Sequence, residues 1–274
     1  MTNAQKIDAY LQRINFTSTP QINFETLHAL QRLHLQNIPY ENLDILRNIP
    51  LSLDANDLFN KIVVRKRGGF CFELNALFSW LLRNLGFKVT DYTSRFLAND
   101  PIIPIRCHRV ISVALDGEDY LCDVGVGRVV PRKPIPIVLG VENEQNGEIY
   151  RLEEDDFLGY VLCELKHSEW RKIFAFTKEQ QLEEDFAMPS FYCEKHPDSI
   201  FRTMDKVHIF TEDGRKSVMD REVRIFSRTG VEVINPGTEA EYEELLRVHF
   251  GINLSLQRSF DKANELNRVI LNNA

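Results

Sequence analysis

A cysteine follows two glycines in the run from Arg67 to Cys71, directly before a segment with helical spacing. The free N–H groups and the positive dipole end of a helix N-terminus stabilise a thiolate, so they lower a thiol pKa from its usual value of about 8.5. The two glycines let another group approach the cysteine closely. Cys71 is therefore a candidate nucleophile, and a buried, inert cysteine is the plain alternative.

A histidine and a carboxylate become neighbours if one β-hairpin forms as its turn residues indicate. Asp116-Gly117 is a strong signal for a two-residue turn, which places Leu115 opposite Glu118. Continued along both strands, this register puts His108 and Asp123 on one face as diagonal neighbours, roughly 7–8 Å apart between Cα atoms. A slip of one residue would put them on opposite faces.

Asp123 stands among apolar residues of a predicted strand, where an unpaired carboxylate is costly. His108 is the obvious partner for it. An imidazole held in this way can take the proton of Cys71 and give a thiolate–imidazolium pair. A purely structural His–Asp hydrogen bond, with Cys71 elsewhere, is the alternative that the residues alone leave open.

Composition limits the class of protein. The 274 residues are 43% hydrophobic and 27% charged, which is typical of a globular chain with two or three packed units. The net charge of -7 argues against nucleic acid as the main partner. Charge-free stretches reach only about ten residues, whereas a membrane span needs roughly 20, and the first residues form no secretory signal.

The five cysteines include no Cys-x-x-Cys pair, so we expect a cytoplasmic protein without a disulfide framework or a structural metal. The side chain of Cys107 is expected to point to the opposite face of its strand from His108. With Cys122 on the paired strand, it is expected only to pack.

Hydrophobic spacing predicts the elements that would position these residues. The first third is expected to form a helical bundle, the middle third an antiparallel sheet or barrel, and the last third a mixture of helices and strands. Helices are predicted at 7–14, 27–34, 54–63, 71–84, 178–186, 239–249 and 260–271. Strands are predicted at 88–95, 106–115 and 120–124, near residues 150, 161 and 170, and on both sides of Asp213-Gly214.

The sequence resembles the arylamine N-acetyltransferase family. The resemblance rests on Arg67-Gly68-Gly69-x-Cys71-x-Glu73-x-Asn75, Ile38-Pro39-Tyr40-Glu41-Asn42-Leu43, His108 and Asp123-Val124-Gly125-x-Gly127, and it covers nearly the whole chain. It implies an α+β multidomain fold with a Cys-His-Asp site between the first two units. These units are a helical bundle at 1–86 that carries the nucleophile, a β-barrel at 87–187 that carries the histidine and aspartate, and an α/β lid at 188–274.

The same resemblance implies Cys71 as the nucleophile, His108 as its base and Asp123 as the carboxylate that orients the imidazole. The donor would be acetyl-CoA, and the reaction a ping-pong transfer through an acetyl-cysteine. Weakly basic arylamines or hydrazines suit the acceptor role because they stay unprotonated at neutral pH. No metal, nucleic acid or membrane is expected to take part, and detoxification and biosynthesis are both open as the biological role.

Substrate contacts are also implied by the resemblance. Tyr40, Phe72 and Val126 are expected to line the acceptor pocket, and Tyr40 and Val126 replace the phenylalanine found in many members. The segment Gly125-Val126-Gly127-Arg128 is a candidate for coenzyme phosphate contacts through its N–H groups and one cation. A plain tight turn is the alternative.

A structural ion pair is expected next to the nucleophile. The family pattern implies that Arg67 pairs with Glu41, with Asn42 or Asp44 helping, and so ties the loop before Cys71 to an earlier loop. Breaking such a buried pair costs roughly 3–5 kcal/mol. Asn75 is expected to have a structural role near the site.

Two functions from other classes remain as alternatives. A Cys-His-Asp set serves amide cleavage equally well, so a cysteine hydrolase or a transglutaminase-like enzyme is one of them. A binding module that has kept the fold and lost turnover is the other.

Overall fold

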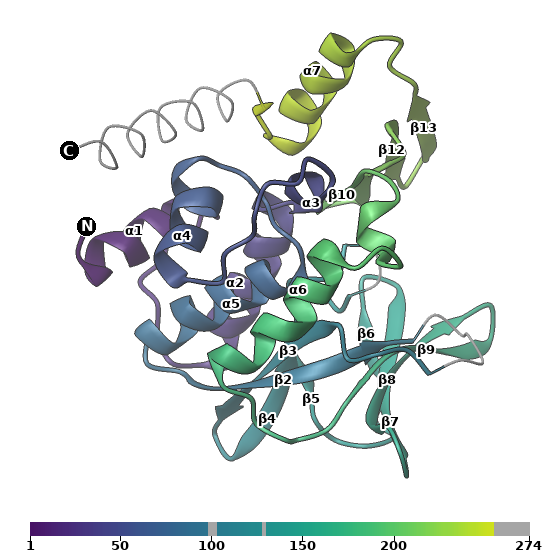
Figure 1. Ribbon diagram of the computed structural model, residues 1–274. Coiled ribbons are helices and arrows are strands. Elements are labelled where there is room, and N and C mark those ends of the chain that lie inside the picture. Colours follow the sequence, from purple (N-terminus) through teal and green to yellow (C-terminus); the bar gives the residue numbers. More distant parts are fainter. Residues whose placement is uncertain (98–102, 128–129, 255–274) are drawn as a thin grey trace.

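The computed structural model describes residues 1–97, 103–127 and 130–254. Its first third is a group of helices, as the hydrophobic spacing predicts (Figure 1). These helices are α1 (Asn3–Arg13), α2 (Phe24–Asn37), α3 (Leu43–Leu46), α4 (Ala55–Phe59) and α5 (Cys71–Asn84), with a π-helical turn η1 (Asn60–Val64) after α4. Asp54 caps α4 as expected, since its side chain accepts hydrogen bonds from the amides of Asn56 and Asp57. The short helix α3 was not predicted.

The middle third forms an eight-stranded antiparallel sheet that curls into a barrel-like form (Figure 1). The strands follow the order β5-β4-β3-β2-β9-β8-β7-β6 across the sheet. They are β2 (Lys88–Phe96), β3 (His108–Leu115), β4 (Glu118–Cys122), β5 (Ile135–Pro136), β6 (Asn143–Gln145), β7 (Glu148–Asp155), β8 (Gly159–Lys166) and β9 (Glu169–Phe176).

The hairpin between β3 and β4 has the predicted register. Leu115 pairs with Glu118, and the ladder runs down to Ile111 and Cys122. Both turn residues, Asp116-Gly117, have positive φ angles of 53° and 86°, as the favoured two-residue hairpin turn requires. The ladder ends at Cys122, so Asp123 lies one residue beyond it, and the strand predicted at 120–124 starts and ends two residues earlier than expected.

The last third contributes a second antiparallel sheet, in the order β1-β10-β11-β12-β13. Its strands are β1 (Tyr40–Glu41), β10 (Lys206–Phe210), β11 (Arg215–Met219), β12 (Glu222–Ser227) and β13 (Gly230–Ile234). Strand β1 comes from the helical third, so this sheet joins the first and last thirds of the chain. Helix α7 (Glu239–Phe250) buries Tyr242 and Leu246 against Val207 and Val218, and it confirms the helix predicted at 239–249. The helix predicted at 260–271 lies outside the described residues.

The helix predicted at 178–186 is wrong. That segment ends in a 3₁₀ turn, η2 (Glu183–Phe186), and the helix proper is α6 (Ala187–Lys195), followed by the 3₁₀ turn η3 (Ile200–Arg202). The buried guanidinium of Arg109 donates hydrogen bonds to both Glu183 carboxylate oxygens and stacks 4.1 Å from the Phe186 ring centroid. These tertiary contacts override the local helical pattern.

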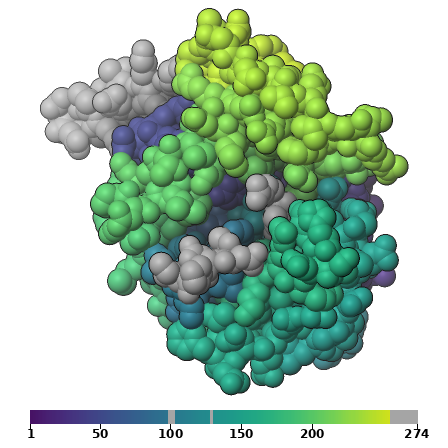
Figure 2. Space-filling model, turned by 90° about the vertical axis from the view of Figure 1, so that its right-hand side faces the viewer, coloured from purple at the N-terminus to yellow at the C-terminus, as the bar shows by residue number. Residues whose placement is uncertain are grey.

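The three parts meet around a hollow. Figure 2 shows it between the green segment around α6, the teal barrel and the yellow-green C-terminal part, with blue atoms of the helical third at its floor. Within the described ranges, every helix is too short or too polar to cross a bilayer.

Candidate active site

Cys71 is the first residue of α5, at the helix N-terminus that the glycine-rich run predicts. The amide of Phe70 donates to Glu73 Oε2 at 3.0 Å, which fixes the start of the helix. Cys71 is only 3% exposed and packs among the aromatic rings of Phe70, Phe72 and other residues of one apolar cluster. The thiol therefore stands at a helix N-terminus inside the protein.

His108 and Asp123 meet as the hairpin register predicts. His108 Nε2 donates to Asp123 Oδ2 at 2.7 Å, and both residues are buried. The other carboxylate oxygen, Oδ1, accepts from Asn75 Nδ2 at 2.8 Å and from the Gly125 amide at 2.7 Å. Asn75 also accepts a hydrogen bond from the Val124 amide. Asp123 is thus held by both of its oxygens, and Asn75 is one of the groups that hold it.

The imidazole of His108 also acts on the thiol of Cys71, whose Sγ lies 3.7 Å from the carbonyl oxygen of Cys107, the residue directly before His108. Because Nε2 is engaged by Asp123, Nδ1 is the ring nitrogen available to the sulfur. Burial acts to lower the pKa of His108, but the charge and hydrogen bond of Asp123, with a smaller contribution from Cys71, raise it to about 10. The surroundings of His108 therefore favour its protonated, imidazolium form.

The expected low pKa of the Cys71 thiol is wrong for this structure. Burial raises the pKa of Cys71, and the hydrogen bond and charge of His108 offset only part of that rise. When the sulfur passes its proton to the neutral imidazole of His108, the thiolate is left beside an imidazolium, which stabilises it. The three side chains can therefore act as an acid–base pair with a nucleophile.

Other groups pack so closely against Gly125 and Gly127 that neither position has room for a side chain. Neither has a positive φ angle, so a tight left-handed turn is not the reason for glycine here. A Cβ atom on Gly125 would lie 2.6 Å from the Cα atom of Cys71, and one on Gly127 would lie 2.4 Å from Cδ2 of His208. The Gly125 amide donates to Asp123 Oδ1, and a contact of this segment with the coenzyme stays a prediction. Arg128 lies outside the described residues.

Of the three expected acceptor residues, Tyr40 and Phe72 pack in the apolar cluster of Cys71, whereas Val126 packs in the larger core cluster. Tyr40, in β1, pairs with Gly69 on one side and with His208 of β10 on the other, so it joins the Cys71 loop to the second sheet. Burial raises the pKa of Tyr40, and the nearby thiols, Cys71 foremost, raise it further. Phe72 and Val126 are both buried.

Arg67 makes the predicted ion pair. Its Nε donates to Glu41 Oε1 at 2.8 Å and its Nη2 to Glu41 Oε2 at 2.9 Å. Of the two proposed helpers, Asp44 contributes, with its Oδ1 2.7 Å from Arg67 Nη2. Asn42 donates instead to the carbonyls of Phe201 and Met204, and so it anchors the last third of the chain.

Two further charges in this network were not predicted. Lys61 Nζ lies 2.8 Å from Asp44 and 2.7 Å from Glu73, the residue that fixes the start of α5. Burial acts to lower the pKa of Lys61, but these carboxylates raise it instead. Lys61 and Glu73 lie on separate elements, so no local spacing relates them. The capping position of Glu73, three residues after Phe70, was the one available signal.

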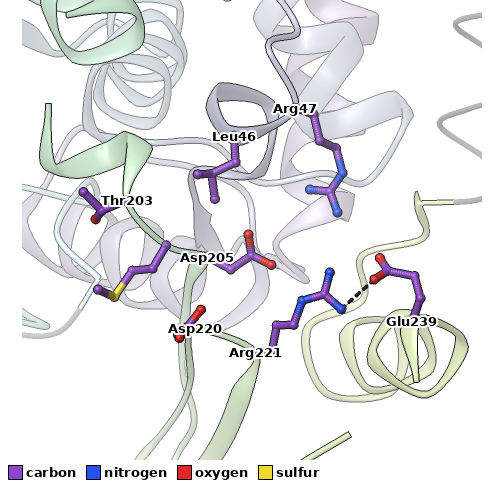
Figure 3. Close-up of a pocket in the computed structure, with 8 residues that line it drawn as sticks. Leu46, Arg47, Thr203, Asp205, Asp220, Arg221 and Glu239 are labelled. Carbon is purple, nitrogen blue, oxygen red and sulfur yellow. Dashed lines mark ion pairs between the residues drawn. The ribbon is translucent and has the colours of Figure 1, made fainter. Parts of the chain in front are cut away.

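A separate pocket of about 390 Å³ lies near the start of α7 (Figure 3). Arg221 and Glu239 form an ion pair of 2.6 Å at its edge. Its lining residues are Leu46, Arg47, Thr203, Met204, Asp205, Asp220, Arg221 and Glu239. None of them belongs to the Cys71 site.

Comparison with known proteins places the chain among acetyltransferases. A family model described as N-acetyltransferase matches residues 23–259. An arylamine N-acetyltransferase of Mycolicibacterium smegmatis is 35% identical over 259 residues, which cover 92% of this chain and 93% of that protein.

Two solved structures share the fold. The arylamine N-acetyltransferase of Mycobacterium marinum in complex with CoA has a TM-score of 0.84 at 32% identity, with 91% of this chain and 93% of that chain covered. An arylamine N-acetyltransferase of Bacillus cereus, which has a Cys-His-Glu catalytic triad, has a TM-score of 0.84 at 25% identity, with 92% of this chain and 100% of that chain covered.

Proposed function

This chain belongs to the arylamine N-acetyltransferase family, and we propose that it carries an acetyl group on Cys71 between acetyl-CoA and the nitrogen of an arylamine or hydrazine. The observation that carries this proposal is the buried His108–Asp123 hydrogen bond beside the buried thiol of Cys71 at the start of α5. The mycobacterial relative that binds CoA and the bacillary relative with a catalytic triad support it by likeness.

In the first half-reaction, the Cys71 thiolate attacks the thioester carbonyl of acetyl-CoA. The S–C bond to coenzyme A breaks, and His108 donates a proton to the departing sulfur. The exchange is close to balanced because the attacking and leaving groups are both thiolates. Asp123 keeps the imidazole oriented and stabilises its charge.

In the second half-reaction, an uncharged amine attacks the acetyl-cysteine. The now neutral His108 accepts the proton that the nitrogen gives up, and Cys71 leaves as a thiolate beside the restored imidazolium. The product is an amide, which is much less reactive than a thioester, so the transfer is hard to reverse. Arylamines and hydrazines suit this step because they are weak bases.

Substrate selection belongs to the same proposal. Tyr40, Phe72 and Val126 would face the acceptor, and the hydroxyl of Tyr40 would add a polar group to an otherwise apolar wall. Gly125, Gly127 and Arg128 stay as candidates for coenzyme contacts. A cytoplasmic location is proposed as well, and cell fractionation would test it.

Steady-state kinetics test this function. Initial rates measured at several concentrations of acetyl-CoA and of an arylamine should give parallel double-reciprocal lines, as a ping-pong reaction requires. The variant Cys71→Ser should be inactive, and Cys163→Ser, which removes a thiol buried between barrel residues, should be active. Intersecting lines would contradict the acetyl-cysteine intermediate. Release of acetate without any amine would favour the hydrolase.

A further inference from the structure

Two thiols that the proposed reaction does not use lie beside Cys71. The carbonyl oxygen of Cys107 lies 3.7 Å from Cys71 Sγ and 3.9 Å from Cys193 Sγ. Cys107 directly precedes His108 at the start of β3, and Cys193 lies on α6. Three cysteines from distant parts of the chain therefore meet at one point.

Cys193 packs in the same apolar cluster as Cys71, and Cys107 packs against that cluster, so the two unused thiols lie close together. Hydrogen bonding by Cys193, helped by the charges of His108 and Arg95, lowers the pKa of Cys107 to about 7 against the opposing effect of burial. The same bond raises the pKa of Cys193, with burial adding to the rise. The lowered pKa favours Cys107 as the more nucleophilic sulfur of the pair.

Solvent exposure also distinguishes Cys107 from the other cysteines. Cys107 is half-buried, whereas Cys71, Cys122, Cys163 and Cys193 are all buried. A small oxidant from solvent thus reaches Cys107 first. Its partner Cys193 packs in the same cluster with its Sγ 3.9 Å from the Cys107 carbonyl oxygen, where a second sulfur would have to be.

We infer that Cys107 and Cys193 are a peroxide-responsive pair that closes to a reversible disulfide next to Cys71. The Cys107 thiolate attacks one oxygen of hydrogen peroxide, the O–O bond breaks, and the other oxygen leaves as hydroxide and becomes water. Cys193 then attacks the sulfenic sulfur of Cys107, forms the S–S bond and releases a second water. The two thiols lose two electrons in total, and one peroxide is reduced to two waters.

Formation of this disulfide would also affect the rate of the proposed acetyl transfer. The two sulfurs must approach to about 2.05 Å, which is much closer than a thiol hydrogen bond. Formation of the bond would move Cys107, the residue directly before His108. It would also link α6 covalently to the loop before β3, next to Cys71. Slower acetyl transfer in the oxidised protein is therefore expected, and this clause alone rests on the proposed function.

The disulfide is tested in the full chain with Cys71→Ser, which cannot perform the proposed reaction. After a short treatment with hydrogen peroxide, intact mass should fall by two hydrogen atoms, and digestion should give one peptide pair joined through Cys107 and Cys193. Dithiothreitol should restore the mass. The same background with Cys193→Ser or Cys107→Ser should form no link, whereas Cys163→Ser should form it normally. Absence of the link in folded protein, or a link between other cysteines, would overturn the inference.

Activity gives the second readout. In the chain with Cys71 present, peroxide should cause a loss of acetyl transfer that dithiothreitol reverses, and the reversible part should be several-fold smaller in Cys193→Ser. An equal reversible loss in both proteins would refute the effect on catalysis. If the chain transfers no acetyl group at all, the proposed function fails, while the mass measurement still decides whether the pair forms a disulfide.

Discussion

The substitution Arg67→Met tests how the chain holds its nucleophile loop. Methionine keeps much of the length of the arginine side chain but removes its charge and every hydrogen bond to Glu41 and Asp44. Arg67 is 1% exposed, so water cannot replace these bonds without opening the structure. The perturbation therefore leaves carboxylates buried with too little positive charge.

The charges of the network set the size of the effect. In the intact protein, Arg67 and Lys61 face the three carboxylates of Glu41, Asp44 and Glu73, and none of the five residues is more than 7% exposed. After the substitution, Lys61 alone faces all three. Removing one partner of a buried pair costs roughly 3–5 kcal/mol, so we expect the free energy of unfolding to fall by about that amount.

Thermal and urea unfolding measure this loss. A change of that size corresponds to a fall in melting temperature of about 6–20 °C for a chain of this length class. The matched control is Arg221→Met, which removes the ion pair with Glu239 at the edge of the pocket in Figure 3. That arginine is half exposed, so its loss should cost no more than about 1 kcal/mol. Equal melting temperatures for the two variants would refute the buried network as a source of stability.

Three further outcomes are expected. Asp123→Asn should slow acetylation of Cys71 far more than it lowers the free energy of unfolding, because the His108 imidazole loses its orienting carboxylate. Rapid-quench kinetics measure the acetylation rate, and urea unfolding measures the stability. An unchanged acetylation rate would remove Asp123 from the site. His108 has a folded pKa of about 10, above its ordinary value of about 6.5, so its stabilisation is fully present below the ordinary value and is lost as pH rises through about 10. Urea unfolding across that range should show the decline, with a smaller one in Asp123→Asn, and parallel curves would argue against the His–Asp pair. Gly125→Ala should abolish acetyl transfer because its Cβ would lie 2.6 Å from the Cα atom of Cys71. The control Gly237→Ala should stay active, since its Cβ would approach only a flexible side chain, at 3.4 Å. Comparable rates of acetyl transfer in the two variants would disprove the packing argument.

Local chemistry made part of this site predictable. The turn Asp116-Gly117 sets the hairpin register through its backbone angles, and that register alone brings His108 to the side of Asp123. The two glycines before Cys71 and the apolar spacing after it place the thiol at the start of a helix. Such features depend on neighbours in sequence, which is why they could be read without a structure.

Other features depend on how separate elements are oriented, and these were missed. Lys61 enters the charge network because η1 packs against α5, which no local pattern records. The sequence placed Cys107 with Cys122 as a packing residue, but its side chain packs against the same cluster as Cys193, which lies on a helix that was predicted in the wrong place. The low thiol pKa expected from a helix N-terminus is opposed by the burial of Cys71, which the sequence left only as an alternative.

One measurement decides whether Cys71 carries the acetyl group. The purified chain is mixed with acetyl-CoA alone, and its intact mass and digest are recorded before and after an arylamine is added. We predict one acetyl adduct, located on Cys71, that disappears as the acetylated amine forms. A folded protein that gains no adduct, or one that carries it on a residue other than Cys71, would contradict the account.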